Sequence, residues 1–236
     1  MIRAILHGGG RMAESIHGVA TSRGVEVVAV VSLQRPGWLQ DAVYADALDT
    51  LDVDADVMID FSLPAGTVAA ADWCAGNGMP FVSGVTGLDE AAFAALDRAA
   101  GQVPVLWAPN MSVGVNLLES LCRTVAAALD DQVPVSIHDV HHRHKKDAPS
   151  GTALALGRAI EASRGEDAPP VRYTDDREGE VVGRHVIRFD MDGEVLELTH
   201  DALDRGIFAS GAADAACWLC RQAPGRYRAA DWLAGR

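Results

Sequence analysis

Short apolar segments alternate with alanine-rich, helix-like segments along the first half of the chain. The apolar segments are rich in Val and Ile and predict strands at residues 3–7, 26–31, 57–61, 80–83 and 103–107. The segments between them predict helices at residues 11–22, 64–75 and 89–99. Gly, Pro, Ser or Asn stand at the junctions, as in crossover loops. This alternation predicts an α/β fold with a doubly wound parallel sheet, whose carboxyl edge carries the ligand sites.

The pattern changes after residue 112. Residues 114–129 predict a long helix, residues 134–140 a strand and residues 150–163 a second helix. Two apolar segments, 186–190 and 194–200, flank the tight-turn dipeptide Asp192-Gly193 and predict an antiparallel hairpin. The polar segment 165–183 is expected to be a mobile loop.

The last alanine-rich segment, residues 206–222, predicts a helix that returns to cover the first sheet. We therefore expect two domains. Residues 1–112 and 206–236 would form a dinucleotide-binding domain. Residues 113–205 would form an α+β domain with an open mixed sheet, for substrate binding and oligomerisation.

Charge restricts the possible partners. The 236 residues carry 20 Lys and Arg against 33 Asp and Glu, a formal net charge of −13. Such a surface repels phosphate backbones and anionic lipids, so we expect neither a nucleic-acid nor a membrane partner. A signal-peptide pattern and a membrane-length apolar run are both lacking, so we expect a cytoplasmic location. An anionic ligand then requires a local basic cluster.

The four cysteines lie in alanine-rich segments, which is typical of small buried residues in a reducing compartment. The spacing of Cys217 and Cys220 also fits a redox pair or half of a zinc site. No second pair or neighbouring histidine completes a ligand set, so packing roles are expected.

A glycine-rich turn follows the first predicted strand. Gly8, Gly10 and Ala13 fit the pattern G-x-G-x-x-[GA] at the start of a helix. Glycine permits the tight turn and lets backbone N–H groups approach a pyrophosphate, which the positive end of the helix stabilises. Arg11 stands where it can reach a phosphate. The turn predicts a dinucleotide site in a Rossmann-like domain.

The end of the second strand bears on the choice of cofactor. Ser32 stands where an acidic residue would hold the ribose 2′-hydroxyl of NAD, and Arg35 follows shortly after it. Serine and arginine can accept a 2′-phosphate that an acid would repel, which favours NADPH over NADH. The alternative is that Arg35 is only a solvated loop charge.

Ionisable residues are densest in segment 138–152, HDVHHRHKKDAPSGT. It holds four of the eight histidines, on a chain that is otherwise acidic. Ser150 or Thr152 is expected to cap a helix whose first N–H groups bind a carboxylate beside Lys145. His141 or His142 could donate a proton near neutral pH.

A metal site is the main alternative for these histidines. His138, His142 and His144 would share one face of a strand and could bind zinc. The basic residues interleaved among them would repel a dication, so no metal is expected. Asp60, at the end of the third strand, is expected to be structural or to cap a loop, and His200 to have a packing role.

The sequence HHRHKKDAPSGTA at residues 141–153 resembles the signature of the 4-hydroxy-tetrahydrodipicolinate reductase family, historically called dihydrodipicolinate reductase. Further matching motifs extend the resemblance along nearly the whole chain: Gly10-Arg11-Met12, Ile59-Asp60-Phe61-Ser62, Gly84-Val85-Thr86-Gly87, residues 110–116 and Leu198-Thr199-His200. The resemblance implies a homotetrameric enzyme of lysine and diaminopimelate biosynthesis. Its members take hydride from NADPH or NADH and reduce the dehydrated form of (4S)-4-hydroxy-tetrahydrodipicolinate, a small dicarboxylate, to tetrahydrodipicolinate.

The resemblance also implies roles for individual residues. His141 would be the proton donor, with Lys145 as its partner. The two substrate carboxylates would be held by His142, Lys145, Ser150, Gly151 and Thr152. Gly84, Thr86 and the turn with Ala108, Asn110 and Met111 would face the nicotinamide. With these, the expected cofactor residues are Gly8, Gly10, Arg11, Met12, Ser32, Arg35 and Phe61.

The chain departs from the family pattern in four places. The glycine-rich turn is one residue shorter with Ala13 for glycine, Ser32 replaces an acidic residue, Val85 replaces a threonine, and the segment 177–185 is shorter. The first two leave open a catalytically weak or regulatory homologue with altered cofactor binding. The last bears on the tetramer.

Overall fold

The computed structural model describes residues 1–235 and divides into two compact units. The first unit comprises Met1–Ser112 and Gly206–Arg236, and the second comprises Val113–Arg205. Among the described residues, no helix has both the length and the apolar character needed to cross a membrane.

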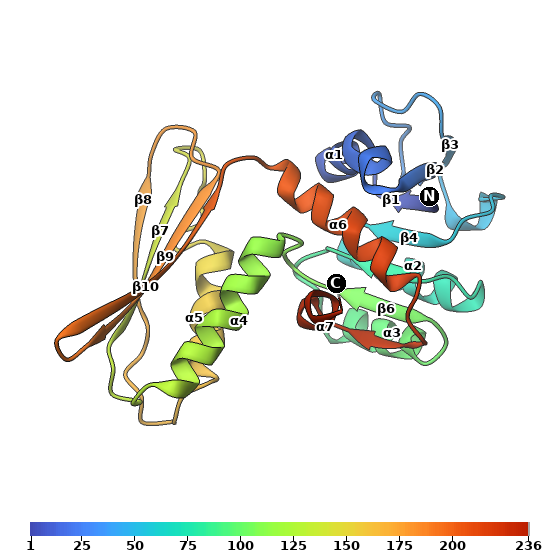
Figure 1. Cartoon of the computed structure of the whole chain (residues 1–236). Coiled ribbons are helices and arrows are strands. Elements are labelled where there is room, and N and C mark those ends of the chain that lie inside the picture. Colours follow the sequence, from blue (N-terminus) through green and yellow to red (C-terminus); the bar gives the residue numbers. More distant parts are fainter. Residues whose placement is uncertain (236) are drawn as a thin grey trace. The chain divides into compact units, whose positions relative to one another are not determined.

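The first unit is built on a seven-stranded sheet in the order β11-β6-β5-β4-β1-β2-β3 (Figure 1). All of its strand pairs are parallel. The strands are β1 (Ile2–His7), β2 (Val25–Val31), β3 (Val43–Ala45), β4 (Val57–Asp60), β5 (Phe81–Ser83), β6 (Pro104–Trp107) and β11 (Gly225–Tyr227). The helices are α1 (Arg11–Ala20), α2 (Pro64–Gly76), α3 (Glu90–Ala100), α6 (Gly206–Leu219) and α7 (Ala229–Ala234), with 3₁₀ turns at Thr21–Arg23 and Leu48–Thr50.

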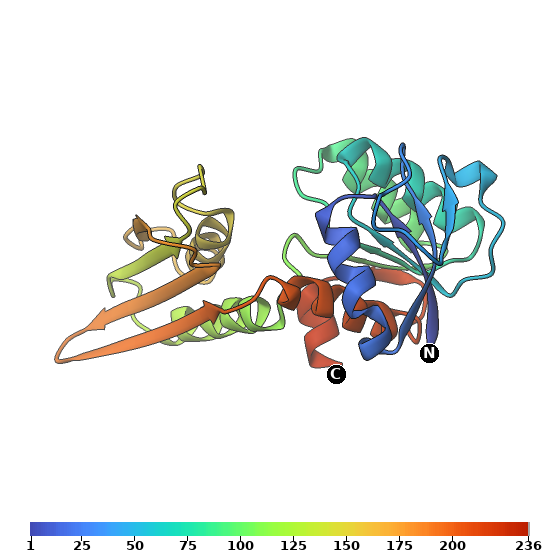
Figure 2. The same cartoon turned by 90° about the horizontal axis from the view of Figure 1, so that it is seen from above.

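Helices cover both faces of this sheet. Blue α1 and red α6 lie together on one face, and α2 and α3 lie on the other (Figure 2). Consecutive residues of β1, Ala4 to Leu6, are therefore buried although their side chains point to opposite faces. The predicted doubly wound parallel sheet is confirmed, and the predicted returning helix is α6, which packs on β4, β5 and β6. Sequence analysis missed β3, β11 and α7, which are too short to show a period.

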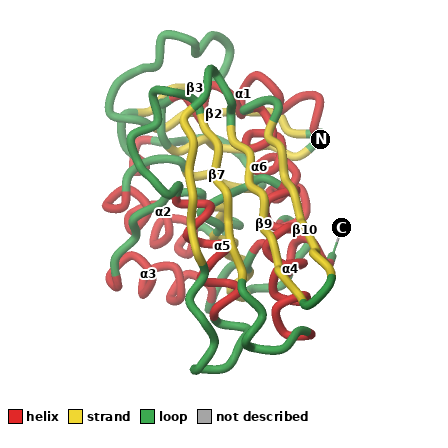
Figure 3. Tube along the Cα trace, turned by 90° about the vertical axis from the view of Figure 1, so that its left-hand side faces the viewer, coloured by secondary structure: helices red, strands yellow, loops and turns green. Residues whose placement is uncertain are grey.

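The second unit has a four-stranded sheet in the order β10-β9-β7-β8 (Figure 3). Its elements are α4 (Val113–Ala128), β7 (Val135–His141), α5 (Gly151–Glu161), β8 (Arg172–Arg177), β9 (Gly183–Met191) and β10 (Glu194–Ala202). β7 pairs with β8 in parallel, whereas the pairs β7–β9 and β9–β10 are antiparallel, which confirms the expected mixed sheet. Apolar residues of α4, α5 and one sheet face form its core.

One prediction about this unit is wrong. Residues 165–183, expected to be a mobile loop, contain strand β8, whose register with β7 runs from Ser136–Arg172 to His141–Arg177. The sequence RYTDDR lacks apolar alternation because β8 is an edge strand and most of its side chains are exposed. The predicted hairpin is present, and both of its strands are longer than expected.

All four cysteines are free thiols, of which Cys74 and Cys122 are buried and Cys217 and Cys220 half-buried. Burial raises the pKa of Cys122 to about 12 and that of Cys220 to about 11. These thiols stay protonated at neutral pH, in keeping with the packing roles expected from the sequence.

Candidate active site

A cavity of about 460 Å³ opens at the carboxyl edge of the sheet in the first unit. The strand order reverses between β1 and β4, and open α/β sheets bind ligands at such a switch point. The walls come from the first turn of α1, from the turns after β4, β5 and β6, from the start of α2 and from α6: Met12, Phe61, Ser62, Leu63, Pro64, Gly84, Val85, Thr86, Pro109, Asn110, Met111 and Phe208.

The glycine-rich turn beside this edge needs its glycines for different reasons. Gly8 has a φ of 107°, and a Cβ there would lie 2.7 Å from the carbonyl oxygen of Phe61. Gly10 has an ordinary φ of −80° and is the N-cap of α1, without a side-chain cap. A Cβ at Gly10 would meet nothing within 4 Å. An oxyanion therefore has room at the N-terminus of α1.

Ser32 and Arg35 follow β2. The Ser32 hydroxyl donates to the carbonyl of Gln34 at 2.8 Å, and Tyr44 donates to the Ser32 carbonyl at 3.0 Å. The guanidinium of Arg35 lies 5.9 Å from the centre of the Tyr44 ring. An exposed cation is thus held beside Ser32, where it is available to an anionic ligand.

The structure places the expected cofactor residues in three groups. Met12, Phe61, Gly84, Thr86, Asn110 and Met111 line the cavity. Gly8, Gly10 and Arg11 form the turn into α1, and Ser32 and Arg35 follow β2. Ala108 is buried after β6 rather than lining the cavity. Sequence analysis did not assign Phe208 to the site, because this residue lies in an apolar, alanine-rich stretch of α6 that carries no sign of ligand binding.

Asp60 ends β4 and is completely buried. Its carboxylate accepts hydrogen bonds from the hydroxyls of Ser62, Thr67 and Ser83, and His7 Nδ1 lies 2.9 Å from it. Burial opposes ionisation, but the bonds from His7, Ser62 and Thr67 outweigh it and hold the pKa of Asp60 below its usual value. Asp60 therefore carries a charge inside the first unit.

The ionisable cluster of the second unit is centred on β7. Alternate residues of this strand are buried, so Asp139 and His141 lie on its buried side, and His138 lies on the other. His138 instead contacts Thr174 and Asp176 on the neighbouring β8.

The metal alternative assumed that His138, His142 and His144 share one face of a strand. Strand β7 ends at His141, before the other two histidines, so the three do not lie on one strand face.

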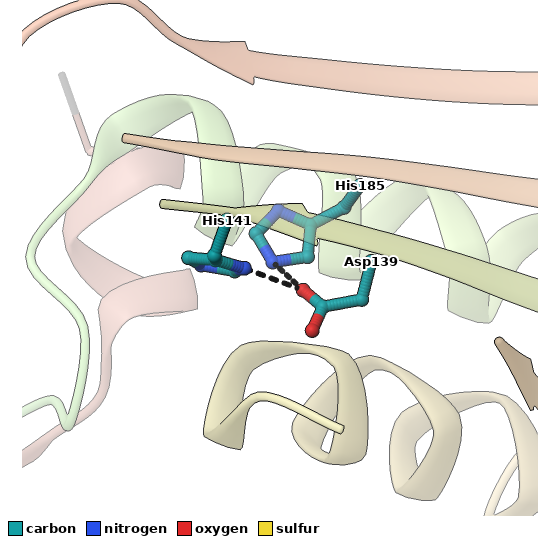
Figure 4. A group of neighbouring side chains, drawn as sticks. All are labelled: Asp139, His141 and His185. Atoms are coloured by element: carbon teal, nitrogen blue, oxygen red, sulfur yellow. Dashed lines mark ion pairs between the residues drawn. The ribbon is translucent and has the colours of Figure 1, made fainter. Parts of the chain in front are cut away.

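Asp139 is the common partner in this cluster (Figure 4). His141 Nδ1 lies 2.9 Å and His185 Nε2 lies 3.3 Å from its Oδ1 atom. The His141 contact has the distance of an ion pair but not the angles of a good hydrogen bond. Both the N–H and the hydroxyl of Ser150 donate to the carboxylate at 2.9 Å, and Arg177 Nη1 lies 3.7 Å from it.

These contacts decide the charge of Asp139. Burial opposes ionisation, but the two imidazoles and Ser150 outweigh it and hold the pKa of Asp139 far below its usual value. Ligand atoms of Asp139, His141 and His185 lie within 4.8 Å of one another, close enough to hold a metal ion. The nearby Arg177 guanidinium and the Ser150 donors already neutralise and saturate the carboxylate, which disfavours a dication.

Sequence analysis missed His185 and Arg177. In the sheet register His185 stands opposite Asp139, Arg177 opposite His141, and His200 opposite His185. Only the register of all four strands of this sheet could have revealed this row. Burial, together with the nearby His185, lowers the pKa of His200. His200 is therefore a member of this row, in addition to the packing role expected for it in the hairpin.

The start of α5 lies next to this cluster. Of the two expected caps, Ser150 is the N-cap, and its hydroxyl accepts from the N–H of Ala153 at 3.1 Å. Lys145 Nζ lies 2.8 Å from the carboxylate of Asp147. The Lys145 hydrogen bond, with a smaller contribution from the N–H of Gly151, lowers the pKa of Asp147. Lys145 thus already binds a carboxylate near the start of the helix.

His142 and Thr152 complete the predicted set. Thr152 is the second residue of α5, and His142 follows β7 and is partly exposed. Desolvation and the positive charge of Arg205 lower the pKa of His142. His142 is therefore mostly neutral at pH 7 and can serve as a hydrogen-bonding group.

Known proteins resemble the chain over its whole length. Family models described as the N-terminus and the C-terminus of dihydrodipicolinate reductase match residues 2–111 and 114–233. The 4-hydroxy-tetrahydrodipicolinate reductase of Alkalilimnicola ehrlichii is 40% identical over an alignment 264 positions long. The alignment covers 98% of this chain and 97% of that protein. The enzyme of the same name from Thiobacillus denitrificans is 43% identical over 196 residues, covering 76% and 73%.

Solved structures show the same fold. A dipicolinate-bound dihydrodipicolinate reductase from Paenisporosarcina sp. TG-14 aligns over 97% of both chains with a TM-score of 0.81 and 23% identity. A myo-inositol 2-dehydrogenase from Lactobacillus plantarum aligns over 98% of this chain and 93% of its own, with a TM-score of 0.64 and 8% identity.

Proposed function

Because the chain belongs to the dihydrodipicolinate reductase family, whose members are NAD(P)H-dependent oxidoreductases, we propose that it reduces 4-hydroxy-tetrahydrodipicolinate in lysine and diaminopimelate biosynthesis. The resemblance found in the sequence is thereby confirmed. The observation that carries the proposal is the buried Asp139–His141 pair. Asp139 accepts a hydrogen bond from Ser150, and Ser150 is also the N-cap of helix α5, whose start would bind a carboxylate. The pair supports a proton donor beside an anion site, as reduction of a cyclic imine dicarboxylate requires.

In this proposal the first unit holds the nicotinamide cofactor, which supplies the hydride when bound. Gly8, Gly10 and Arg11 would receive the pyrophosphate, because the start of α1 is open to an oxyanion. Met12 and Phe61 would contact the nicotinamide half together with the other expected residues that line the cavity: Gly84, Thr86, Asn110 and Met111.

His141 would donate the proton. Its Nδ1 atom faces Asp139, which leaves Nε2 for the substrate. A Cβ at Gly183 would lie 3.0 Å from this Nε2 atom, so the glycine keeps its surroundings open. The Asp139 carboxylate beside Nδ1 orients the ring for proton transfer. Asp139 and His185 act through His141 and are positioning residues.

The substrate carboxylates would bind at the start of α5. Lys145 already binds the Asp147 carboxylate, and a substrate carboxylate offers the same chemistry to Lys145 and to the Gly151 N–H at the helix start. Thr152 and His142 would add further hydrogen bonds. Both donors of Ser150 point to Asp139, so Ser150 would fix the helix start relative to the proton donor.

Three finer features belong to the same proposal. Ser32 and Arg35 favour NADPH, because a cation and a hydroxyl at this strand end suit a 2′-phosphate. The second unit would bind substrate and assemble a homotetramer through the sheet face opposite α4 and α5, which its own helices leave uncovered. We place the enzyme in the cytoplasm, where its amino-acid substrates are made.

A coupled assay tests the proposal. The substrate is generated from pyruvate and aspartate semialdehyde by the condensing synthase, and nucleotide absorbance is followed with NADPH or NADH. We expect nucleotide consumption that depends on both precursors and on this protein. Consumption of neither nucleotide by the wild-type protein would refute the proposal and favour a catalytically inactive homologue.

A further inference from the structure

Asp60 joins the turns that line the cavity of the first unit. Its Oδ1 atom faces His7 Nδ1 at 2.9 Å and accepts from the N–H and hydroxyl of Ser62 at 3.1 and 2.6 Å. Its Oδ2 atom accepts from Thr67 at 2.7 Å and from Ser83 at 3.0 Å. These donors belong to the ends of β1, β4 and β5 and to the first turn of α2. One carboxylate thus connects three strand ends and a helix.

The link through Ser83 reaches the cavity wall. The Ser83 hydroxyl donates to Asp60 and accepts from the N–H of Val85 at 3.3 Å. The carbonyl of Val85 in turn accepts from the indole N–H of Trp107 at 2.8 Å. Val85 and both of its neighbours, Gly84 and Thr86, line the cavity. Val85 is therefore held by a hydrogen bond at its N–H and by another at its carbonyl. The bond at the N–H leads through Ser83 to the buried Asp60.

The link through Thr67 does not involve the segment Gly84–Thr86. Thr67 is completely buried in α2, and it is not among the residues that line the wall. It donates to the same Oδ2 atom as Ser83, and its N–H donates to the carbonyl of the wall residue Leu63 whether or not the hydroxyl is present. The two hydroxyls therefore satisfy the same carboxylate oxygen, but only Ser83 passes the contact on to Val85.

We propose that Asp60 is a positioning residue for the nicotinamide cofactor, acting through Ser83 on the segment Gly84–Thr86. The inference rests on the cofactor role proposed for the cavity. It goes beyond that role because Asp60 lies behind the wall and touches no ligand. Its function is to keep the wall in the shape that receives the cofactor before binding, which reduces the ordering cost of binding.

An ionised carboxylate suits this position, because the Ser62 N–H and the hydroxyls of Ser62, Thr67 and Ser83 all donate to it. In Asp60→Asn the oxygen would stay at the Oδ1 site, where His7 and the Ser62 N–H need an acceptor. The amide NH₂ would then face Thr67 and Ser83. Thr67 can turn its hydroxyl to the Leu63 carbonyl, 3.4 Å away. Ser83 loses its acceptor, so the substitution loosens the segment that lines the cavity.

The test compares Ser83→Ala with the matched variant Thr67→Val. Each removes one buried hydroxyl from Asp60, so both should lower the melting temperature by a similar few degrees. Dissociation constants for NADPH and NADH are measured without substrate, from the change in nucleotide fluorescence on binding. We expect Ser83→Ala to raise the dissociation constant of the preferred nucleotide about tenfold, and Thr67→Val to change it less than twofold. A tenfold change corresponds to about 1.4 kcal/mol.

Equal dissociation constants for the two variants, whether raised or unchanged, would overturn the inference and leave Asp60 a general stabilising residue. Asp60→Asn is measured alongside and should resemble Ser83→Ala. If it fails to fold, the Ser83 and Thr67 comparison still decides. A wild-type protein that binds neither nucleotide would refute the proposed function itself, an outcome distinct from wild-type binding with equal variants.

Discussion

The Nδ1 atom of His141 lies 2.9 Å from the Oδ1 atom of Asp139, and both side chains are buried on the same face of the second sheet. The contact fixes which ring nitrogen faces the protein and which faces outward. It also places the charged Asp139 carboxylate beside the imidazole ring. The role of His141 can therefore be tested separately from substrate binding.

Replacing His141 with glutamine should lower kcat by about 10²- to 10⁴-fold, because a positioned proton donor contributes that much. KM for the dicarboxylate should change little, since the donor acts in the transition state. Steady-state kinetics with saturating cofactor measure both. His138→Gln is the matched control: it lies on the same strand, faces the opposite way and should keep wild-type kinetics. Wild-type turnover by His141→Gln would remove its assigned role.

Acid stability should report the charge of Asp139. A carboxyl whose folded pKa is depressed contributes stability above its unfolded pKa of about 3.9, and that stability is lost as the pH falls further. At pH 7 Asp139→Asn should cost about 3 kcal/mol, because His141, His185 and Arg177 lose a buried partner. The difference from wild type should shrink below about pH 4. Urea unfolding between pH 7 and pH 3 measures it, and a constant difference would contradict the assignment.

Lys145 should serve substrate binding. Its Nζ atom already binds the Asp147 carboxylate, so Lys145→Ala should raise KM for the dicarboxylate about tenfold or more and also lower kcat. The dissociation constant for the nucleotide should not change. Lys146→Ala removes an equal charge from the exposed neighbouring residue and serves as the control. Similar kinetics for the two variants would mean that general charge, not the Lys145 contact, attracts the substrate.

How much the sequence could reveal differs between the two sites. The turn at Gly8 and the segment 141–152 are local in sequence, so residue type and spacing were enough to find them. His185 and Arg177 enter the cluster only through the register of β9 and β8 with β7, which no local pattern encodes. Strand β8 was missed because its side chains are mostly exposed and polar.

Asp60 shows the same limit. Its position at the end of a strand was visible in the sequence and suggested a structural role. Its hydrogen-bond donors come from residues 7, 62, 67 and 83, which only the parallel strand order brings together. The buried charge and its link to the cavity wall could therefore be found only in the folded chain.

We predict that cofactor preference depends on Arg35. We expect the wild-type enzyme to prefer NADPH, and Arg35→Ala to raise KM for NADPH about tenfold while leaving KM for NADH unchanged. Arg11→Ala should raise both, because the pyrophosphate is common to the two nucleotides. Initial rates at matched nucleotide concentrations test this. A clear wild-type preference for NADH would contradict the assignment of Arg35.

The last prediction concerns Gly10. Its φ is ordinary and a Cβ would meet no protein atom within 4 Å, so Gly10→Ala should fold with a melting temperature close to that of wild type. The added methyl group would occupy the space at the start of α1 that the pyrophosphate needs, so the nucleotide dissociation constant should rise about tenfold.

Gly18→Ala in the same helix is the control for this variant, because its Cβ also meets nothing within 4 Å. It should stabilise α1 by about 0.5–1 kcal/mol through helix propensity and leave nucleotide binding unchanged. Nucleotide titration and thermal unfolding of both variants separate the two effects. If Gly10→Ala binds nucleotide as tightly as Gly18→Ala does, the pyrophosphate does not lie at the start of α1.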